Sequence, residues 1–250
     1  MKILYFTATG NCLYVAKQFG GDMISIPQAI KEERYEFSDD KIGLVIPIYW
    51  LGIPLYVEDF LKKVKLNSNY IFSVLTYGKF AGSASVQLDV LAKECGINFS
   101  YIKPLKMVDN FLPSFDMTKQ IKNEPEKMID EHLQSIINDV NSSRILPAKS
   151  SIIAKLISKK MRKRSMIGDG MAMDFLVEDS CVKCGKCVVL CPLDNVKAEG
   201  FKPEFGARCM SCLACTQNCP TNSIRIRKEK SNARFRNQHI TLKEIEDANR

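Results

Sequence analysis

The stretch Cys181-Val-Lys-Cys184-Gly-Lys-Cys187-Val-Val-Leu-Cys191-Pro192 is followed by a second run of the same pattern, Cys209-Met-Ser-Cys212-Leu-Ala-Cys215-Thr-Gln-Asn-Cys219-Pro220. Both runs read C-x₂-C-x₂-C-x₃-C-P, a spacing that ligates [4Fe–4S] clusters. Three thiolates at intervals of three let a short loop curl around one cubane. The fourth cysteine leaves that loop, because the proline after it fixes φ and stops the chain from continuing as a helix. The runs therefore predict two iron–sulfur clusters.

Residues 175–228 resemble the two-cluster bacterial ferredoxins through these runs, which implies a small α+β ferredoxin domain. The resemblance implies that each cluster takes three cysteines from one run and the last from the other: Cys181, Cys184, Cys187 and Cys219 for one, and Cys209, Cys212, Cys215 and Cys191 for the second. Val196 and Ile224 occupy equivalent positions after the runs, as two halves with a shared core require. Zinc is the alternative, but paired C-x₂-C sites do not explain the third cysteine or the repeated proline.

The N-terminus predicts a phosphate-binding turn. Residues 2–6 read as a buried strand, and the turn Thr7-Ala8-Thr9-Gly10-Asn11-Cys12 leads into an amphipathic helix over residues 13–19. Backbone N–H groups, threonine hydroxyls and a helix dipole converge at such a turn. The turn differs from G-x-x-x-x-G-K-[ST], which disfavours a nucleotide triphosphatase.

Strands and helices alternate over the first 140 residues. Further strands are expected at 23–26, 42–48, 70–75 and 101–108, and helices at 55–64, 83–95 and 126–140. Such alternation predicts an α/β fold with a doubly wound parallel sheet, whose ligands lie beyond the carboxyl ends of the strands. The loops at 7–12, 49–52 and 76–82 meet that condition.

Residues 1–140 resemble flavodoxin, whose first loop of T-x-T-G-x-T type holds the phosphate of FMN. The resemblance implies that the phosphate is held by Thr7, Thr9, Gly10, Asn11 and Cys12, and that the isoalloxazine ring lies near Tyr49, Trp50 and the segment Thr76-Tyr77-Gly78. Cys12 replaces the hydroxyl residue of the family, and a thiol is the weaker donor. A single tryptophan such as Trp50 is otherwise more often a core residue.

Charge and cysteine content divide the chain into parts. Residues 1–150 hold 17 Lys and Arg against 17 Asp and Glu, so the net charge of +8 lies in residues 151–250. Eight of the ten cysteines lie in the two runs, which indicates metal chemistry in a reducing cytoplasm sooner than disulfides. We expect a flavodoxin-like domain at 1–145, a basic amphipathic linker at 146–172, the cluster domain at 173–230 and a charged tail at 231–250.

No secretory signal is evident, and the longest uncharged stretch, residues 42–57, is shorter than the roughly 20 residues of a spanning helix. We therefore expect a cytoplasmic protein. The basic linker either covers an apolar groove, which we favour, or contacts an acidic membrane or partner. The positive charge predicts redox partners with an acidic docking surface. Nucleic acid is disfavoured, because the basic residues are not interleaved with stacking aromatics.

Together the parts resemble the flavodoxin–ferredoxin fusion proteins of anaerobic bacteria. That resemblance implies an electron carrier in which the clusters exchange electrons with FMN. Two alternatives stay open: a flavin-dependent reductase fed by the clusters, and a flavin-free module that binds a partner. No paired acid and base is evident in the sequence, which favours a carrier over a substrate-converting enzyme.

Overall fold

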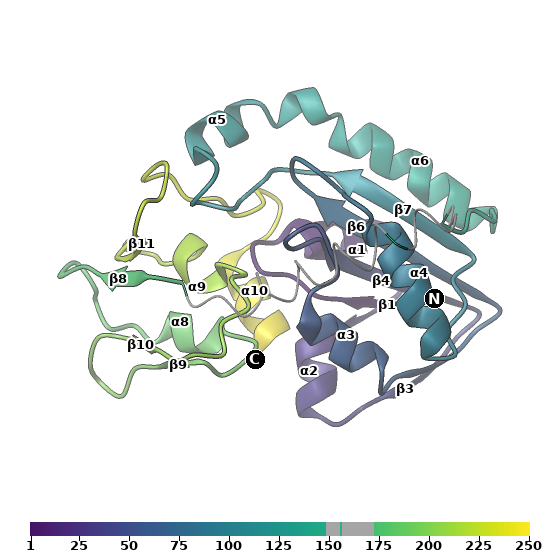
Figure 1. Cartoon of the computed structure of the whole chain (residues 1–250), viewed down its shortest axis with the longest axis horizontal. Helices are drawn as coiled ribbons and strands as arrows, with labels where there is room; N and C mark the ends of the chain where they lie inside the picture. The colour runs from purple at the N-terminus through teal and green to yellow at the C-terminus, as the bar shows by residue number, and fades with distance from the viewer. Residues whose placement is uncertain (149–155, 157–172) are drawn as a thin grey trace.

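The computed structural model describes residues 1–148, 156 and 173–250 (Figure 1). Its central sheet has five parallel strands in the order β2-β1-β4-β6-β7. The strands are β1 (Lys2–Tyr5), β2 (Asp22–Ser25), β4 (Lys41–Pro47), β6 (Tyr70–Tyr77) and β7 (Tyr101–Lys106). This is the strand order of flavodoxin-like doubly wound sheets, which confirms the predicted α/β class.

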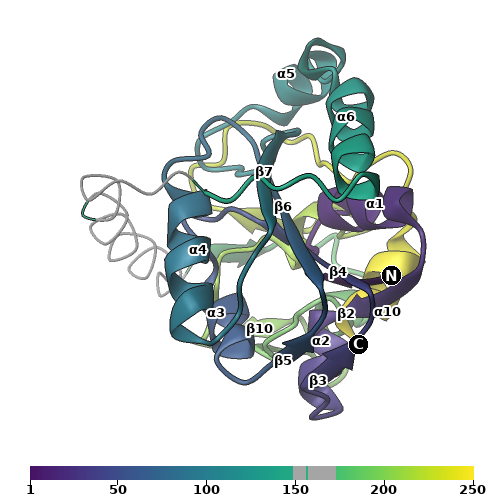
Figure 2. The same ribbon diagram turned by 90° about the vertical axis from the view of Figure 1, so that its right-hand side faces the viewer.

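Helices cover both faces of the sheet. Helices α1 (Asn11–Phe19) and α6 (Ile129–Asn141) lie on one side, and α3 (Leu55–Leu61) and α4 (Ala84–Glu94) lie on the other, as Figure 2 shows. Because both faces are covered, β4 is buried from Ile42 to its end and reads as a continuous apolar run. Apolar side chains of the strands therefore pack into two hydrophobic cores, one between the sheet and each layer of helices.

Several short elements are absent from the sequence prediction. Helix α2 (Ile26–Lys31) follows β2 directly, and Glu36–Ser38 (β3) pairs in parallel with Lys65–Asn67 (β5). Helix α5 (Met117–Lys122) precedes a 3₁₀ turn over Pro125–Lys127. The helix expected from residue 126 therefore begins only at α6, after this turn.

The cysteine-bearing part consists of two small antiparallel sheets and two short helices. Phe175–Val177 (β8) pairs with Ile224–Ile226 (β11), and Val196–Lys197 (β9) pairs with Glu204–Phe205 (β10). Helices α8 (Lys186–Val189) and α9 (Ala214–Gln217) carry the third cysteine of each run. Val196 and Ile224 are both buried, one in each sheet.

The C-terminal segment returns to the N-terminal sheet. Helix α10 (Leu242–Asn249) is capped by Thr241 and Glu244, each of which bonds the backbone N–H of the other. It packs against α2, and Ile245 and Ala248 join the core under α1. The segment lies between the two parts in Figure 1. The expected tail is therefore a folded element that joins them.

The expected linker lies almost wholly outside the described residues. Leu146, at its start, extends the sheet beside β7 by accepting from Ile102 N–H at 3.0 Å. Among the helices that the structure describes, none is long and apolar enough to cross a membrane.

Candidate cofactor sites

The eight clustered cysteines surround two small cavities. One cavity is lined by Cys181, Cys184, Cys187 and Cys219. The other is lined by Cys191, Cys209, Cys212 and Cys215. Each cavity thus takes three cysteines from one run and the last cysteine from the other. These are the two sets that the ferredoxin resemblance implies.

The two runs share their backbone conformation as well as their spacing. Lys183 and Ser211 hold equivalent positions and have φ of 56° and 58°, and Gly185 and Leu213 have φ of 72° and 60°. Alternation between right-handed and left-handed residues turns successive N–H groups toward one point, as in anion and iron–sulfur nests. The curled loop expected from the spacing is therefore present twice.

Backbone N–H groups already point at three of the sulfurs. Ser211 N–H donates to Cys209 Sγ, Asn195 N–H to Cys191 Sγ and Ser223 N–H to Cys219 Sγ, each at 3.3 Å. Hydrogen bonds to cluster sulfurs are among the levers on a reduction potential. Cys191 and Cys219 hold equivalent positions in the two runs, and each accepts from the N–H group of the residue four positions later.

The cysteines differ in exposure between the two cavities. Cys215 is buried and Cys184 is exposed. Burial raises the pKa of the Cys212 thiol well above its ordinary value and raises the pKa of Cys187 to about 11. The Cys187 and Cys212 thiols therefore need a bound cation to become thiolates at neutral pH.

In the described part of the chain, no three His, Cys, Asp or Glu side chains are grouped as ligands of one metal ion. A cubane does not require such a group, because each of its four thiolates binds a different iron.

A larger cavity of about 260 Å³ lies at the carboxyl ends of β1, β4, β6 and β7. It is lined by nine of the ten residues predicted to contact FMN: Thr7, Thr9, Asn11, Cys12, Tyr49, Trp50, Thr76, Tyr77 and Gly78. Gly10 does not line it. A Cβ at Gly10 would meet the Cβ atoms of Asn237 and Ile240, each at 3.0 Å, so Gly10 faces the C-terminal segment.

One end of the cavity carries uncharged hydrogen-bond donors. Thr7 Oγ1 accepts from Gly10 N–H at 3.1 Å, and Thr9 Oγ1 accepts from Asn110 Nδ2 at 2.5 Å. Each threonine therefore keeps its own hydroxyl hydrogen to donate. Cys12 Sγ and Thr76 Oγ1 lie 3.1 Å apart and share a hydrogen bond. This donor set fits an anionic group such as a phosphate.

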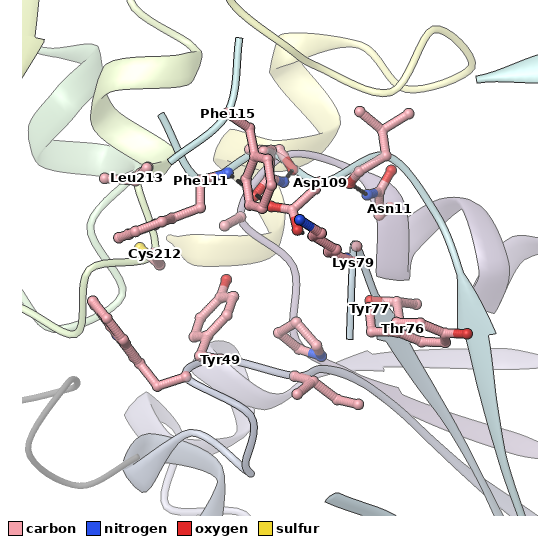
Figure 3. A pocket seen from close by; sticks show the side chains of 18 of the residues that line it. Asn11, Tyr49, Thr76, Tyr77, Lys79, Asp109, Phe111, Phe115, Cys212 and Leu213 are labelled. Carbon is pink, nitrogen blue, oxygen red and sulfur yellow. Dashed lines mark hydrogen bonds between the residues drawn. The ribbon is translucent and has the colours of Figure 1, made fainter. Parts of the chain in front are cut away.

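The other end is aromatic. Tyr49 and Trp50 line it together with Phe111 and Phe115, and the rings of Trp50 and Phe111 meet edge to face, with their centroids 5.0 Å apart. Figure 3 shows Asn11, Thr76 and Tyr77 on one side of the cavity and Phe111, Leu213 and Cys212 on the other. Trp50 therefore lies at a cavity wall and is not a core residue.

The turn that carries Trp50 has an uncommon backbone. Trp50 and Leu51 have φ of 51° and 69°, and Tyr49 and Gly52 exchange two backbone hydrogen bonds across them. Left-handed residues other than glycine cost on the order of 1–3 kcal/mol each and gather at functional sites. The turn holds the indole at the cavity wall at that cost.

Sequence reasoning missed a fourth loop, which follows β7. Asp109 accepts from Lys79 N–H at 2.9 Å and from Phe111 N–H at 3.2 Å, and burial raises the pKa of its carboxyl. Asp109 thus ties this loop to the loop after β6. The signal was present, because the carboxyl end of the last strand must reach the same edge of the sheet as the others.

The large cavity and one cysteine cavity share two lining residues, Cys212 and Leu213. Of these two shared residues Cys212 is the cysteine, and Ser211 lines the large cavity beside it. The aromatic end of the large cavity therefore adjoins the cysteine set of Cys191, Cys209, Cys212 and Cys215.

Comparison with known proteins defines the class of the cysteine-bearing part. Through a segment of 56 to 59 residues, about the size of the cysteine-bearing part, the chain belongs to a family of ferredoxin-like iron–sulfur subunits that transfer electrons. Its relatives include the pyruvate synthase subunit PorD of Methanocaldococcus jannaschii, which is 36% identical over 59 residues, or 22% of this chain and 67% of PorD. PorD of Methanothermobacter marburgensis is 30% identical over 56 residues, again 22% of this chain and 67% of PorD. No protein-family model matches the chain.

Proposed function

We propose that this protein carries electrons through two [4Fe–4S] clusters and exchanges them with FMN bound at the large cavity. The observation that supports this most is the position of Cys212, which lines both the large cavity and one cysteine cavity. Electron transfer needs short distances between redox groups. A residue that lines both cavities implies that groups bound in them lie close together. The chain thereby combines the role of its iron–sulfur relatives with a second redox site.

The cysteine sets support two clusters. Cys181, Cys184, Cys187 and Cys219 hold the first in this proposal, and Cys191, Cys209, Cys212 and Cys215 hold the second. The first set opens to solvent at Cys184, whereas Cys215 of the second is buried. The first cluster is therefore suited to exchange electrons with other proteins, and the second with the flavin site.

The large cavity fits FMN at both ends. Thr7 and Thr9 offer hydroxyl hydrogens to the phosphate, and Tyr49 and Trp50 offer ring faces and edges to the isoalloxazine. When bound there, FMN supplies two-electron chemistry, while each cluster carries one electron at a time. The buried Cys12 thiol bonds Thr76 and takes no part in the chemistry.

We infer that the partners are redox proteins with acidic surfaces. Residues 151–172 carry six Lys and Arg against one Asp, so this segment accounts for +5 of the net charge of +8, and its charged residues lie outside the described residues. Attraction by these residues weakens with salt, as for other charge-steered encounters. Reduction by a partner should therefore slow as ionic strength rises.

Oxygen-free purification with analysis of bound groups tests the proposal. The expected result is about eight iron ions and eight acid-labile sulfides per chain, with one acid-releasable FMN. Zinc or no metal in iron-replete cultures would overturn the cluster assignment. Full iron and sulfide without FMN binding, even after incubation with FMN, would leave the carrier and remove the flavin site. Turnover of a specific organic acceptor would favour the reductase instead.

A further inference from the structure

Three consecutive carbonyl groups of the predicted phosphate loop are bound from behind by asparagines. Asn249 Nδ2 donates to Thr7 O at 3.3 Å, and Asn218 Nδ2 donates to Ala8 O at 3.0 Å. The backbone N–H of Asn237 donates to Thr9 O at 2.8 Å. All three asparagines come from the cysteine-bearing part or the C-terminal segment, more than 200 residues away in the chain.

The three asparagines are built into the core. Their exposed fractions are 3% for Asn218, 2% for Asn237 and 0% for Asn249. Asn218 and Asn249 use the same device: each amide also donates to the carbonyl four residues earlier, Ala214 O and Ile245 O, both at 2.9 Å. A helix end thus holds each side chain in place.

Their burial has a cost. The Oδ1 atoms of Asn218 and Asn249 are buried and have no hydrogen-bond partner among the described residues. A buried, unpaired acceptor costs about 1–3 kcal/mol. An apolar residue of similar shape would avoid this cost, but it could not donate to the loop carbonyl groups. The Nδ2 bonds to Ala8 O and Thr7 O are therefore what asparagine contributes at these two positions.

The bonds fix the direction of the loop N–H groups. In a trans peptide the N–H points opposite to the C=O of the same unit. Because Thr7 O and Ala8 O point to the asparagines, the N–H groups of Ala8 and Thr9 point away from Asn249 and Asn218. Thr7, Ala8 and Thr9 all line the large cavity.

We infer that Asn218, Asn237 and Asn249 are positioning residues that select phosphorylated flavin, by holding the 7–10 loop with the N–H groups of Ala8 and Thr9 facing the phosphate end of the cavity. The inference rests on the proposed flavin site. It gives the C-terminal segment a role in ligand recognition and joins the second cysteine run to the same loop, since Asn218 directly precedes Cys219.

The test compares FMN with riboflavin, which lacks the phosphate. Cluster-loaded, flavin-stripped protein is titrated with each flavin by fluorescence, as wild type and as Asn249→Leu and Asn218→Leu, which keep the side-chain size and remove the donor. Asn138→Ala, at an exposed asparagine of α6, is the matched control. We expect wild type to prefer FMN, and each Leu variant to bind FMN on the order of tenfold more weakly, the effect of weakening one charged hydrogen bond.

Riboflavin affinity should stay within about twofold in these variants, which also reports that the cavity is folded. An unchanged FMN-to-riboflavin ratio, or equal losses for both flavins, would overturn the positioning role while leaving the flavin site. Wild-type protein that binds neither flavin would overturn the flavin site and this inference together.

Discussion

Lys186 Nζ lies 2.5 Å from Glu246 Oε1, so the C-terminal helix α10 is ion-paired to the first cysteine run. Lys186 stands between Cys184 and Cys187 and lines the cavity of the first cysteine set. Glu246 is nearly buried, with 10% of its side chain exposed, whereas Lys186 is 38% exposed. The carboxylate therefore offsets a positive charge beside the proposed first cluster.

Removal of either partner should move the reduction potential of that cluster, in opposite directions. A reduced cluster carries one more negative charge, which a nearby cation stabilises. Lys186→Met should lower the potential and Glu246→Gln should raise it, each by roughly tens of millivolts. EPR-monitored redox titration measures both. Lys243→Met is the control, because Lys243 pairs with the exposed Asp247 on the same helix. Shifts of the same sign would contradict this electrostatic role.

The exchange of the fourth cysteine between runs predicts a pattern of cluster loss. Cys191→Ser with Cys209→Ser removes two ligands of one proposed set, so about four iron ions per chain should remain. Cys191→Ser with Cys181→Ser removes one ligand from each set and should reduce iron further. Iron and sulfide analysis of both double variants, purified without oxygen, measures the cluster content of each. The reverse ranking would mean that each run holds its own cluster.

The sequence predicted the sheet well because parallel strands are buried on both faces. Runs such as residues 42–48 are apolar throughout, and a loop ends each of them at one edge. The short elements were missed because three-residue strands leave no periodicity. Helix α2 did carry a local signal: Ser25 accepts from Gln28 N–H and Pro27 occupies the first turn.

The role of the C-terminal segment could not be predicted from local sequence patterns. Thr241 and Glu244 have the spacing of a capping box, which marks the start of α10. Nothing in that pattern shows that Asn249 meets Thr7, because the two residues are brought together only by tertiary packing. Asp109 is a similar case, since its bonds to Lys79 and Phe111 depend on how two loops meet.

The Cys12 thiol should be inert. Burial raises its pKa to about 12, and the bond to Thr76 lowers it by less. A raised pKa reduces the thiolate fraction at every pH below it, here to about a thousandth at pH 9. Iodoacetamide should therefore leave Cys12 unmodified from pH 7 to 9, while the half-buried Cys95 reacts first. Peptide mass spectrometry after oxygen-free labelling measures both sites. Equal labelling would show that Cys12 is open to reagent and ionised.

Gly78 and Asp109 should be energetically coupled. A Cβ at Gly78 would lie 2.2 Å from Asp109 Cγ, although the backbone of Gly78 itself suits other residues. Gly78→Ala should therefore destabilise the protein by steric overlap alone, at about 1–3 kcal/mol. Asp109→Ala should also destabilise it, because Lys79 N–H and Phe111 N–H lose their acceptor.

In the double variant the added methyl no longer meets the carboxylate. The double variant should therefore lose less unfolding free energy than the two single variants lose in sum, by about 0.5–3 kcal/mol, the range for residues in contact. Thermal unfolding of oxygen-free samples with matched cofactor content measures the cycle, since bound groups shift the apparent stability. Additive costs would mean that the loop after β6 moves away from Asp109 to admit the methyl group. The cavity edge would then be set by the backbone of that loop and not by this contact.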